Sequence, residues 1–162
     1  MNIRIGIRTT ISPAYSWQQR NGRNFSGVVS RETPMSTLKK ETGDFGENMA
    51  VEYLIKKGYQ IVAKNYRFKN FGEIDLVTKK DGVLVFFEVK TRNKFYALNY
   101  PTWTSINIRK RRSLQRICNI FIRNNKEYAG KDWRVDGLFI NLDGRNITDI
   151  EHLENILWGS YY

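Results

Sequence analysis

Apolar and polar residues follow patterns along this 162-residue chain that predict two long helices and four or five strands. Apolar residues spaced by three and four predict helices, whereas short apolar-rich segments between turn residues predict strands. The helices are expected at residues 44–57 and 105–124, with a short terminal helical segment from Glu151. The strands are expected at residues 59–68, 74–79, 83–91, 133–141 and 146–150. This order predicts an α/β fold in which helices cover a central sheet.

The first helix carries an acid on its predicted inner face. Asp44 is expected to cap the N-terminus of this helix, and Gly58 to follow its C-terminus. Glu47 lies three and seven positions before Ala50 and Leu54, on the stripe that should face the core. A buried carboxylate calls for a partner or a function. The alternative is that Glu47 stands in an exposed first turn, where the helix dipole favours an acid.

The second and third strands are predicted to form a hairpin that gathers four charged side chains. Asp81-Gly82 lies between two apolar-rich segments, which is a strong signal of a two-residue hairpin turn. The register set by this turn places Asp75 opposite Glu88, and Glu73 opposite Lys90. Because side chains alternate between the faces of a strand, all four should project from the same face.

One interpretation of this cluster is a metal-dependent site for phosphodiester hydrolysis. Asp75 and Glu88, together with the carbonyl of Val89, can hold one cation, because Mg²⁺ takes one or two protein carboxylates. Lys90 can orient the attacking water or offset charge on the phosphate, and Glu47 can reach the ion directly or through water. Carboxylates facing each other across a hairpin destabilise it, and sequences tolerate such conflicts mainly at functional sites.

The other interpretation is purely structural. Glu73–Lys90 and Glu88–Arg92 are then ordinary salt bridges, and Asp75 caps a turn. Charge pairs on strands are common, so the hairpin by itself leaves both interpretations open.

The composition restricts which metals and compartments are plausible. The only cysteine is Cys118 and the only histidine is His152, so neither a disulfide framework nor a Cys/His zinc site can be built. Carboxylates remain as ligands, and they suit Mg²⁺ or Mn²⁺. No run of 18 apolar residues predicts a membrane span, and without contrary signals a cytoplasmic location is expected.

The chain is strongly basic, with a net charge of +11 and an isoelectric point near 9.8. Such a charge favours a polyanionic partner, and nucleic acid is the commonest one. The alternative is a solvated surface that happens to be rich in lysine and arginine. The candidate phosphate contacts are Arg92, Lys110 and the neighbouring arginines Arg109, Arg111 and Arg112.

Residues 1–40 are expected to be a basic, flexible extension of a single domain that covers residues 41–162. The first 34 residues lack hydrophobic periodicity and carry five arginines and one acid. Their composition resembles that of an organellar transit peptide. Alternatively, Met35 is the true start, because the residues after it look like an ordinary N-terminus.

Several motifs together resemble one protein family over residues 43–157. The principal motifs are Gly43-x-x-Gly46-Glu47, Gly72-Glu73-Ile74-Asp75-Leu76, Phe87-Glu88-Val89-Lys90-Thr91-Arg92, Ile108-x-Lys110, Arg134-Val135-Asp136 and Ile150-x-His152. They resemble the YraN-like family of predicted endonucleases, within the PD-(D/E)xK restriction-endonuclease-like superfamily. Ile74 takes the place of the usual proline.

The resemblance implies a restriction-endonuclease-like fold, a central mixed sheet flanked by helices. It also implies that Asp75, Glu88 and Lys90 are catalytic and that Glu47 assists. Within this cluster we interpret Glu73 as a support for Lys90. The function predicted is a Mg²⁺- or Mn²⁺-dependent endonuclease acting on DNA with branched or single-stranded features, with a homodimer as a possible assembly. The alternative is a non-catalytic nucleic-acid-binding module on the same fold.

Overall fold

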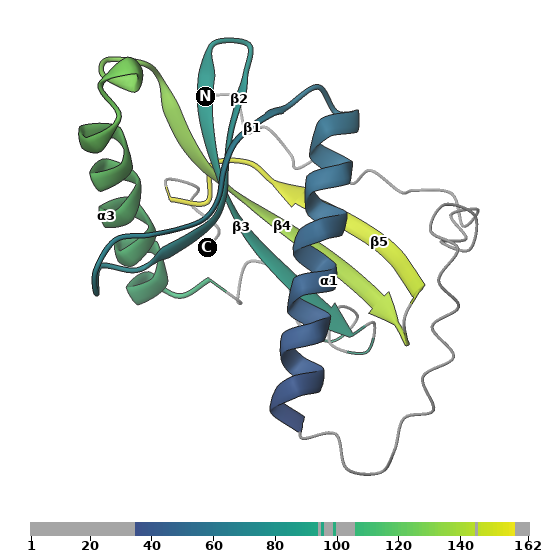
Figure 1. Cartoon of the computed structure of the whole chain (residues 1–162). Coiled ribbons are helices and arrows are strands. Elements are labelled where there is room, and N and C mark those ends of the chain that lie inside the picture. The colour runs from purple at the N-terminus through teal and green to yellow at the C-terminus, as the bar shows by residue number, and fades with distance from the viewer. Residues whose placement is uncertain (1–34, 94, 96–98, 100–105, 145, 158–162) are drawn as a thin grey trace.

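A five-stranded sheet lies between two helices in the computed structural model, which describes residues 35–93, 95, 99, 106–144 and 146–157 (Figure 1). The elements are α1 (Met35–Lys56), β1 (Gln60–Arg67), β2 (Glu73–Lys80), β3 (Val83–Asn93), α3 (Ile108–Asn124), the 3₁₀ helix η3 (Lys126–Tyr128), β4 (Trp133–Asp143) and β5 (Asn146–Leu153). The sheet order is β1-β2-β3-β4-β5, with β3 and β4 parallel and the other pairs antiparallel. The predicted α/β fold with a mixed sheet flanked by helices is confirmed.

The two faces of the sheet form separate cores. Ala50 and Leu54 of α1 pack with Phe87 and Val89 of β3 on one face. On the other face, the apolar stripe of α3 packs against residues such as Phe86. Strand β3 is therefore buried on both sides, as its continuous apolar sequence predicts.

The hairpin between β2 and β3 has the predicted two-residue turn. Lys80 pairs with Val83, and the ladder continues from there with the expected register. Asp81 and Gly82 have φ values of 50° and 82°. A type I′ turn requires positive φ at both central residues, which explains the Asp-Gly sequence.

The predicted start of the first helix is wrong. Helix α1 begins at Met35, so Asp44 lies inside the helix and does not cap it. The expected boundary at residue 40 likewise falls within α1, while residues 1–34 lie outside the described part. The misleading signal was Gly43-Asp44, because glycine is disfavoured in helix interiors and aspartate is a common N-cap residue. Gly46 is in the helix for a packing reason, because a Cβ there would lie 1.8 Å from Oγ1 of Thr91 in β3.

The predicted terminal helix from Glu151 is also wrong. Strand β5 continues to Leu153, and its last residues pair with β4 between Gly137 and Phe139. The apolar residues at positions 150, 153 and 157 have helical spacing, but hydrogen bonding to β4 decides the conformation. The other strands and the second helix lie within about three residues of their predicted bounds. None of the described helices is both long enough and apolar enough to cross a bilayer.

Candidate active site

The candidate site lies where β2 and β3 separate. Their backbone pairing ends at Leu76↔Phe87. Beyond this point β2 stays with β1 and runs toward α3, whereas β3 continues beside β4 (Figure 1). Backbone groups that would pair in an unbroken ladder are therefore free to bond to side chains at the separation.

Asp75 and Glu88 face each other at this separation. The backbone N–H of Val89 donates to Oδ2 of Asp75 at 2.7 Å, so the carboxylate replaces the missing backbone pair. The Glu88 side chain is 1% exposed. Burial, followed by repulsion from Glu88, raises the pKa of Asp75 to about 7 against the smaller opposing effect of the Val89 hydrogen bond. Two acids are thus held close together in a poorly hydrated position.

Two lysines neutralise Glu88. Nζ of Lys90 lies 2.7 Å from Oε1 of Glu88, and Nζ of Lys110 lies 2.8 Å from Oε2. Lys110 reaches the site from the first turn of α3, which Asn107 caps by accepting a hydrogen bond from the Lys110 N–H. The sequence predicted Lys110 as a phosphate contact but gave no sign of its pairing with Glu88.

Lys90 is held in its charged form in this arrangement. Burial lowers the pKa of Lys90, but the charge of Glu88 and its hydrogen bond outweigh that effect and raise the pKa above its usual value. The side chain therefore acts as a cation and hydrogen-bond donor, not as a base.

The predicted position of Glu73 opposite Lys90 is wrong, because the pairing of β2 with β3 ends at Leu76↔Phe87. Its side chain instead pairs with Arg67 across the β1–β2 ladder, with 2.7 Å between Nη2 and Oε2. The reason is the separation of the strands, which takes Glu73 away with β2 while Lys90 stays on β3.

Glu47 approaches from the other side of the sheet. It is half-buried on α1, which packs against the face of β3 that carries Val89. Glu88 projects from the opposite face, toward Lys110 of α3. The link between Glu47 and the site is electrostatic. The hydrogen bond that Arg67 donates to Glu73 raises the pKa of Arg67, and the charges of Glu47 and Asp75 add to the effect.

Arg92 is more firmly anchored than a free phosphate contact would be. Its side chain is 11% exposed, lies over the ring of Phe139 at 5.1 Å, and donates to Oδ1 of Asn141 at 3.2 Å. Glu151 lies 3.8 Å from the same guanidinium nitrogen, Nη2. Burial lowers the pKa of Arg92 against the opposing charge of Glu151. Contact of Arg92 with phosphate stays a prediction.

The arginines around Lys110 differ in exposure. Arg109 and Arg112 are exposed, whereas Arg111 is half-buried with its Nε enclosed. Cys118 is fully buried on the inner stripe of α3, and burial raises the pKa of its thiol. Cys118 is therefore a packing residue of the core on this face of the sheet.

A second buried polar cluster lies around Asp136 of β4. Asp136 accepts from Nε of Arg134 at 3.0 Å and from the backbone N–H of Asn155 at 2.8 Å, and lies 2.9 Å from Nε2 of His152. Asp136 and Arg134, two residues apart on β4, thus form an ion pair. The contact with His152 was not predicted, because residues 151–153 were expected to be helical. This cluster fixes the C-terminal segment to β4.

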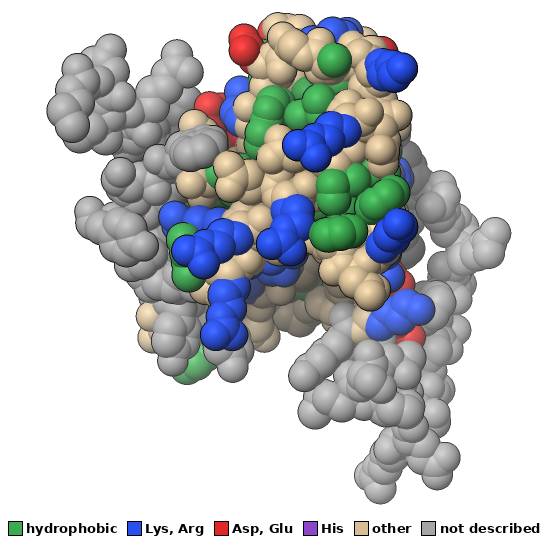
Figure 2. All heavy atoms as spheres, turned by 90° about the vertical axis from the view of Figure 1, so that its left-hand side faces the viewer, with side chains coloured by type: hydrophobic (Ala, Val, Ile, Leu, Met, Phe, Trp, Pro, Cys, Tyr) green, Lys and Arg blue, Asp and Glu red, His purple; other side chains and the backbone are tan. Residues whose placement is uncertain are grey.

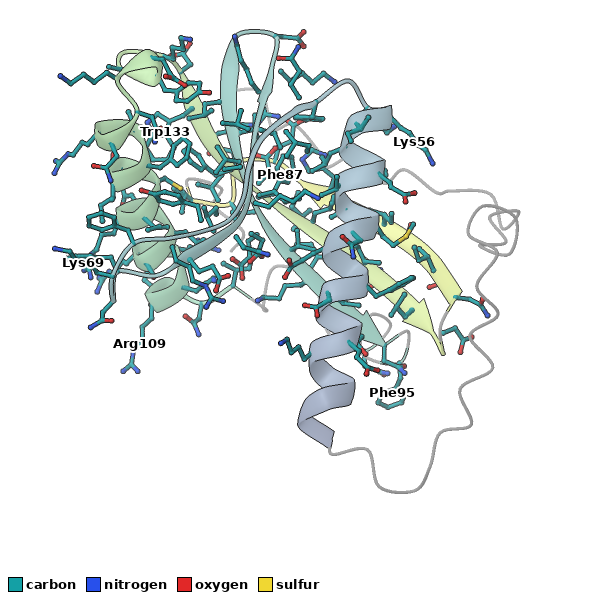
Figure 3. All side chains as sticks on the ribbon, viewed as in Figure 1. Lys56, Lys69, Phe87, Phe95, Arg109 and Trp133 are labelled. Carbon is teal, nitrogen blue, oxygen red and sulfur yellow. The ribbon has the colours of Figure 1, made fainter. Side chains whose placement is uncertain are left out.

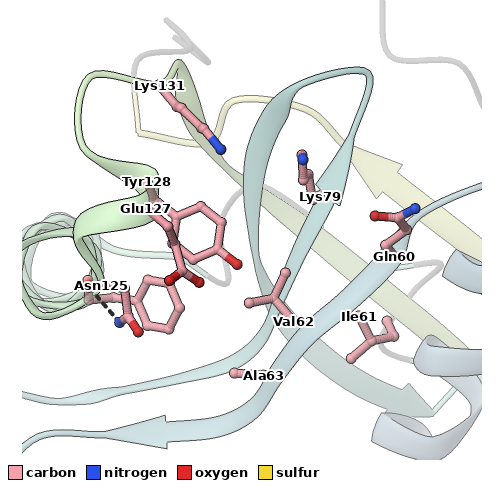
Figure 4. Close-up of a pocket in the computed structure, with 10 residues that line it drawn as sticks. Gln60, Ile61, Val62, Ala63, Lys79, Asn125, Glu127, Tyr128 and Lys131 are labelled. Atoms are coloured by element: carbon pink, nitrogen blue, oxygen red, sulfur yellow. Dashed lines mark hydrogen bonds between the residues drawn. The ribbon is translucent and has the colours of Figure 1, made fainter.

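Two hollows open beside α3. The larger, about 580 Å³, lies between the β1–β2 hairpin and residues 125–131, and it contains none of the predicted site residues (Figure 4). Lys79, Tyr128 and Lys131 are among the side chains that line it. The smaller is a groove of about 430 Å³ beside Phe71 and Arg116.

The candidate site offers few ligands for a divalent cation. Among the described residues no group of three or more His, Cys, Asp or Glu side chains is arranged so that it could hold a metal ion. Asp75 and Glu88 form a pair, and Mg²⁺ ordinarily needs only one or two carboxylates besides water. Repulsion between the two acids is the feature that a cation would relieve.

Comparison with known proteins places this site within the matched part of the chain. A family model described as "Uncharacterised protein family UPF0102" matches residues 46–140. A UPF0102 protein of Caldicellulosiruptor bescii is 39% identical over 117 residues, which are 72% of this chain and 96% of the relative. Those of Chloroherpeton thalassium and Chloroflexus aurantiacus are 44% and 34% identical, covering 62% and 74% of this chain and 75% and 94% of the relatives.

Proposed function

This chain belongs to the protein family UPF0102, the YraN-like family that its motifs resemble, and we propose that it is a metal-dependent nuclease. The reaction proposed is hydrolysis of phosphodiester bonds in nucleic acid, with DNA as the proposed substrate. The observation that carries the proposal is the pair of adjacent buried acids, Asp75 and Glu88, whose repulsion helps raise the pKa of Asp75 to about 7. Proteins keep such a costly arrangement mainly where it has a function.

A divalent cation is the partner that best suits this pair. Asp75 and Glu88 supply two carboxylates from neighbouring strands, and the carbonyl of Val89 adds a neutral oxygen ligand beside them. A bound Mg²⁺ or Mn²⁺ would activate water and stabilise the charge that develops on the phosphate. A cation at Glu88 would compete with the ammonium of Lys110, which lies 2.8 Å from Oε2.

The two lysines have distinct proposed roles. Lys90 remains positively charged, so it can donate a hydrogen bond to a phosphate oxygen or hold the attacking water in place. Lys110 is about one-third exposed on α3, so its ammonium can move from Glu88 to a phosphate without unfolding the helix. Glu47 is proposed to assist through the charges around Arg67, whose pKa the charges of both Glu47 and Asp75 help to raise.

A basic surface beside the site supports a polyanionic substrate. Lysine and arginine side chains gather on the face that α3 presents, and acidic side chains lie at its margins (Figure 2). Helix α3 contains six basic residues and no acid. An electrostatic surface of this kind binds phosphate backbones and makes binding depend on salt.

Cleavage assays with matched variants test the proposal. Labelled duplex, single-stranded and branched DNAs are incubated with the full-length protein in Mg²⁺, Mn²⁺ or EDTA. Cleavage by the wild type is expected only with metal, and Asp75→Asn and Lys90→Ala should lower it at least about 100-fold while binding is largely retained. Equal cleavage by wild type and Asp75→Asn would contradict the mechanism.

A non-catalytic binding module is the second candidate. The observation that favours it is the neutralisation of Glu88 by Lys90 and Lys110, which makes a closed and stable arrangement without metal. This candidate predicts nucleic-acid binding that does not require Mg²⁺ and no cleavage by any variant.

A further inference from the structure

We propose that the outer face of α3 and the adjoining β1–β2 turn bind a single-stranded stretch of nucleic acid, with one unpaired base stacked on Phe71. The inference rests on the proposed function, because it names the part of the nucleic-acid substrate that lies next to Asp75 and Glu88. The aromatic ring and the unpaired cations that carry it do not depend on catalysis.

The base-binding groove has an aromatic floor. It encloses about 430 Å³ and is lined by Phe68, Phe71, Arg116, Asn119, Ile120 and Arg123. The rings of Phe68 and Phe71 are stacked, with centroids 6.2 Å apart and an interplanar angle of 26°. Phe71 is 41% exposed, which is unusual for a large apolar side chain in this protein. Its accessible ring can accept a base, because every nucleobase has a π-face.

The groove is bordered by cations that have no acidic partners. Four arginines of α3 are exposed and form no ion pair with any described residue; they are Arg109, Arg112, Arg116 and Arg123. Because they are spaced by three, four and seven positions, they form one stripe along the helix. Nζ of Lys69 lies 5.5 Å from the centre of the Phe68 ring. Lys69 and Arg109 project outward on the same side of the molecule (Figure 3).

The aromatic pair is fixed to α3 by tight packing. Gly72 has a φ of 124°, and a Cβ at this position would lie 2.6 Å from Oγ of Ser113. The Ser113 hydroxyl also donates to the carbonyl of Phe71 at 3.4 Å. The turn therefore sits directly on the helix and presents Phe71 in a defined place.

The groove and the candidate active site are built on the same two elements, β2 with its preceding turn and α3. Asp75 follows Phe71 by four residues, which corresponds to at most about 13 Å along an extended chain. Lys110 lies on the same helix as Arg116, less than two turns away. A strand whose phosphates follow the arginine stripe would thus reach the separation of β2 and β3.

Single strands fit this surface better than the other candidate partners. Bases in a duplex are stacked on each other and cannot lie on Phe71, whereas unpaired bases can. A protein partner would need a larger apolar area than two rings and Ile120 surrounded by arginines. The combination of aromatic rings and cations is typical of single-strand binding.

Fluorescence anisotropy with full-length protein in EDTA tests the inference without cleavage. The probes are labelled single-stranded DNA, single-stranded RNA of the same sequence, and blunt duplex DNA of equal length. Phe71→Ala should weaken single-strand binding roughly 5- to 100-fold and change duplex binding less than about twofold. Phe71→Trp should retain single-strand binding, because the ring is preserved. The DNA and RNA probes show whether the 2′-hydroxyl matters at this site.

Further variants separate stacking from charge. Ile55 is a comparably exposed apolar residue on α1, so Ile55→Ala should leave binding of all three probes unchanged. Arg116→Ala and Arg123→Ala should each reduce the single-strand salt slope by about 0.7, whereas Phe71→Ala should not change it.

Equal weakening of single-strand and duplex binding by Phe71→Ala, or no weakening, would overturn the inference. The result is independent of catalysis. Single-strand binding that needs Phe71, without any Mg²⁺-dependent cleavage, would support the surface and reject the nuclease. Cleavage that needs Asp75, without any effect of Phe71→Ala, would do the reverse.

Discussion

At the scale of single residues, the Asp75–Glu88 pair is the feature that folding alone does not explain. Asp75 is useful to the fold as an acceptor for the Val89 N–H, but an uncharged amide oxygen could serve equally well. Its charge is disfavoured by burial and by Glu88, which together raise its pKa. The carboxylate thus costs stability in the metal-free protein without a structural return.

The first prediction concerns the pH dependence of this cost in EDTA. The folded pKa of Asp75, about 7, exceeds the unfolded value of 3.8, so the native state binds the proton more tightly. This contribution destabilises the native state progressively as pH rises from about 4 to about 7, and remains above that. Asp75→Asn should therefore stabilise the protein more at pH 8 than at pH 5. The gain in unfolding free energy should differ between the two pH values by on the order of 1–3 kcal/mol, and thermal or urea unfolding at both pH values measures it.

Asp81→Asn is the matched control for this measurement. Asp81 is exposed in the hairpin turn at a φ of 50°, a conformation that asparagine also tolerates. Its substitution should not produce a stability difference that grows between pH 5 and pH 8. A pH-independent effect of Asp75→Asn would show that the acid is not destabilised by its surroundings.

The residues of the site were predictable only where local register determines them. The Asp-Gly turn fixes the pairing between β2 and β3, so the proximity of Asp75 and Glu88 follows from counting. The loss of Glu73 to Arg67 does not follow, because strand separation depends on packing against α3. The contact of Lys110 with Glu88 joins residues 22 positions apart through tertiary structure, which no local pattern encodes.

At the scale of elements, the close approach of α1 to β3 helps to hold the candidate site together. Gly46 lies against Thr91, one residue beyond Lys90 on β3. A helix with any larger residue at this position would have to move away from the strand. The glycine is therefore a packing requirement, although it weakens the helix itself by about 1 kcal/mol relative to alanine.

Two substitutions in the same helix are predicted to have opposite effects on stability. In Gly46→Ala the new Cβ would lie 1.8 Å from Oγ1 and 3.1 Å from Cβ of Thr91, so the net loss should be roughly 1–3 kcal/mol. Gly43→Ala meets no atom within 4 Å and should stabilise the protein by about 0.5–1 kcal/mol. Urea unfolding of both variants provides the measurement.

A double variant identifies the cause of the Gly46→Ala effect. Thr91→Ala removes the atom that the new Cβ would contact most closely, so part of the loss should be recovered in the double variant. Additive effects of the two substitutions would mean that Thr91 is not responsible.

The elements themselves were largely predictable because their signals are local. Alternation and turn residues indicate the strands, and the apolar stripe indicates α3. The two errors have different causes. The Gly43-Asp44 pair resembles a helix start although the helix continues through it from Met35, and residues 151–153 resemble a helix until β4 pairs with them.

At the scale of the whole molecule, charge is divided between an interior and a surface. Inside, two acids and two lysines balance one another where β2 and β3 separate. Outside, α3 carries arginines that no described acid neutralises. A polyanion bound to the outer surface of α3 would bring its phosphates close to Asp75 and Glu88. At that site a divalent cation would compete with Lys110 for Glu88.

Metal binding should therefore appear in the stability of the whole protein. A ligand that binds only the native state stabilises it by RT ln(1 + [L]/Kd), which is about 1.4 kcal/mol at a concentration ten times Kd. Titrating wild type with Mn²⁺ to about 10 mM should raise its melting temperature by several degrees if Kd is near 1 mM. Asp75→Asn should lose most of this rise, whereas Asp81→Asn should keep it. Lys110→Ala should shift the titration to lower Mn²⁺, because the competing ammonium is gone, and no response in wild type would contradict the metal site.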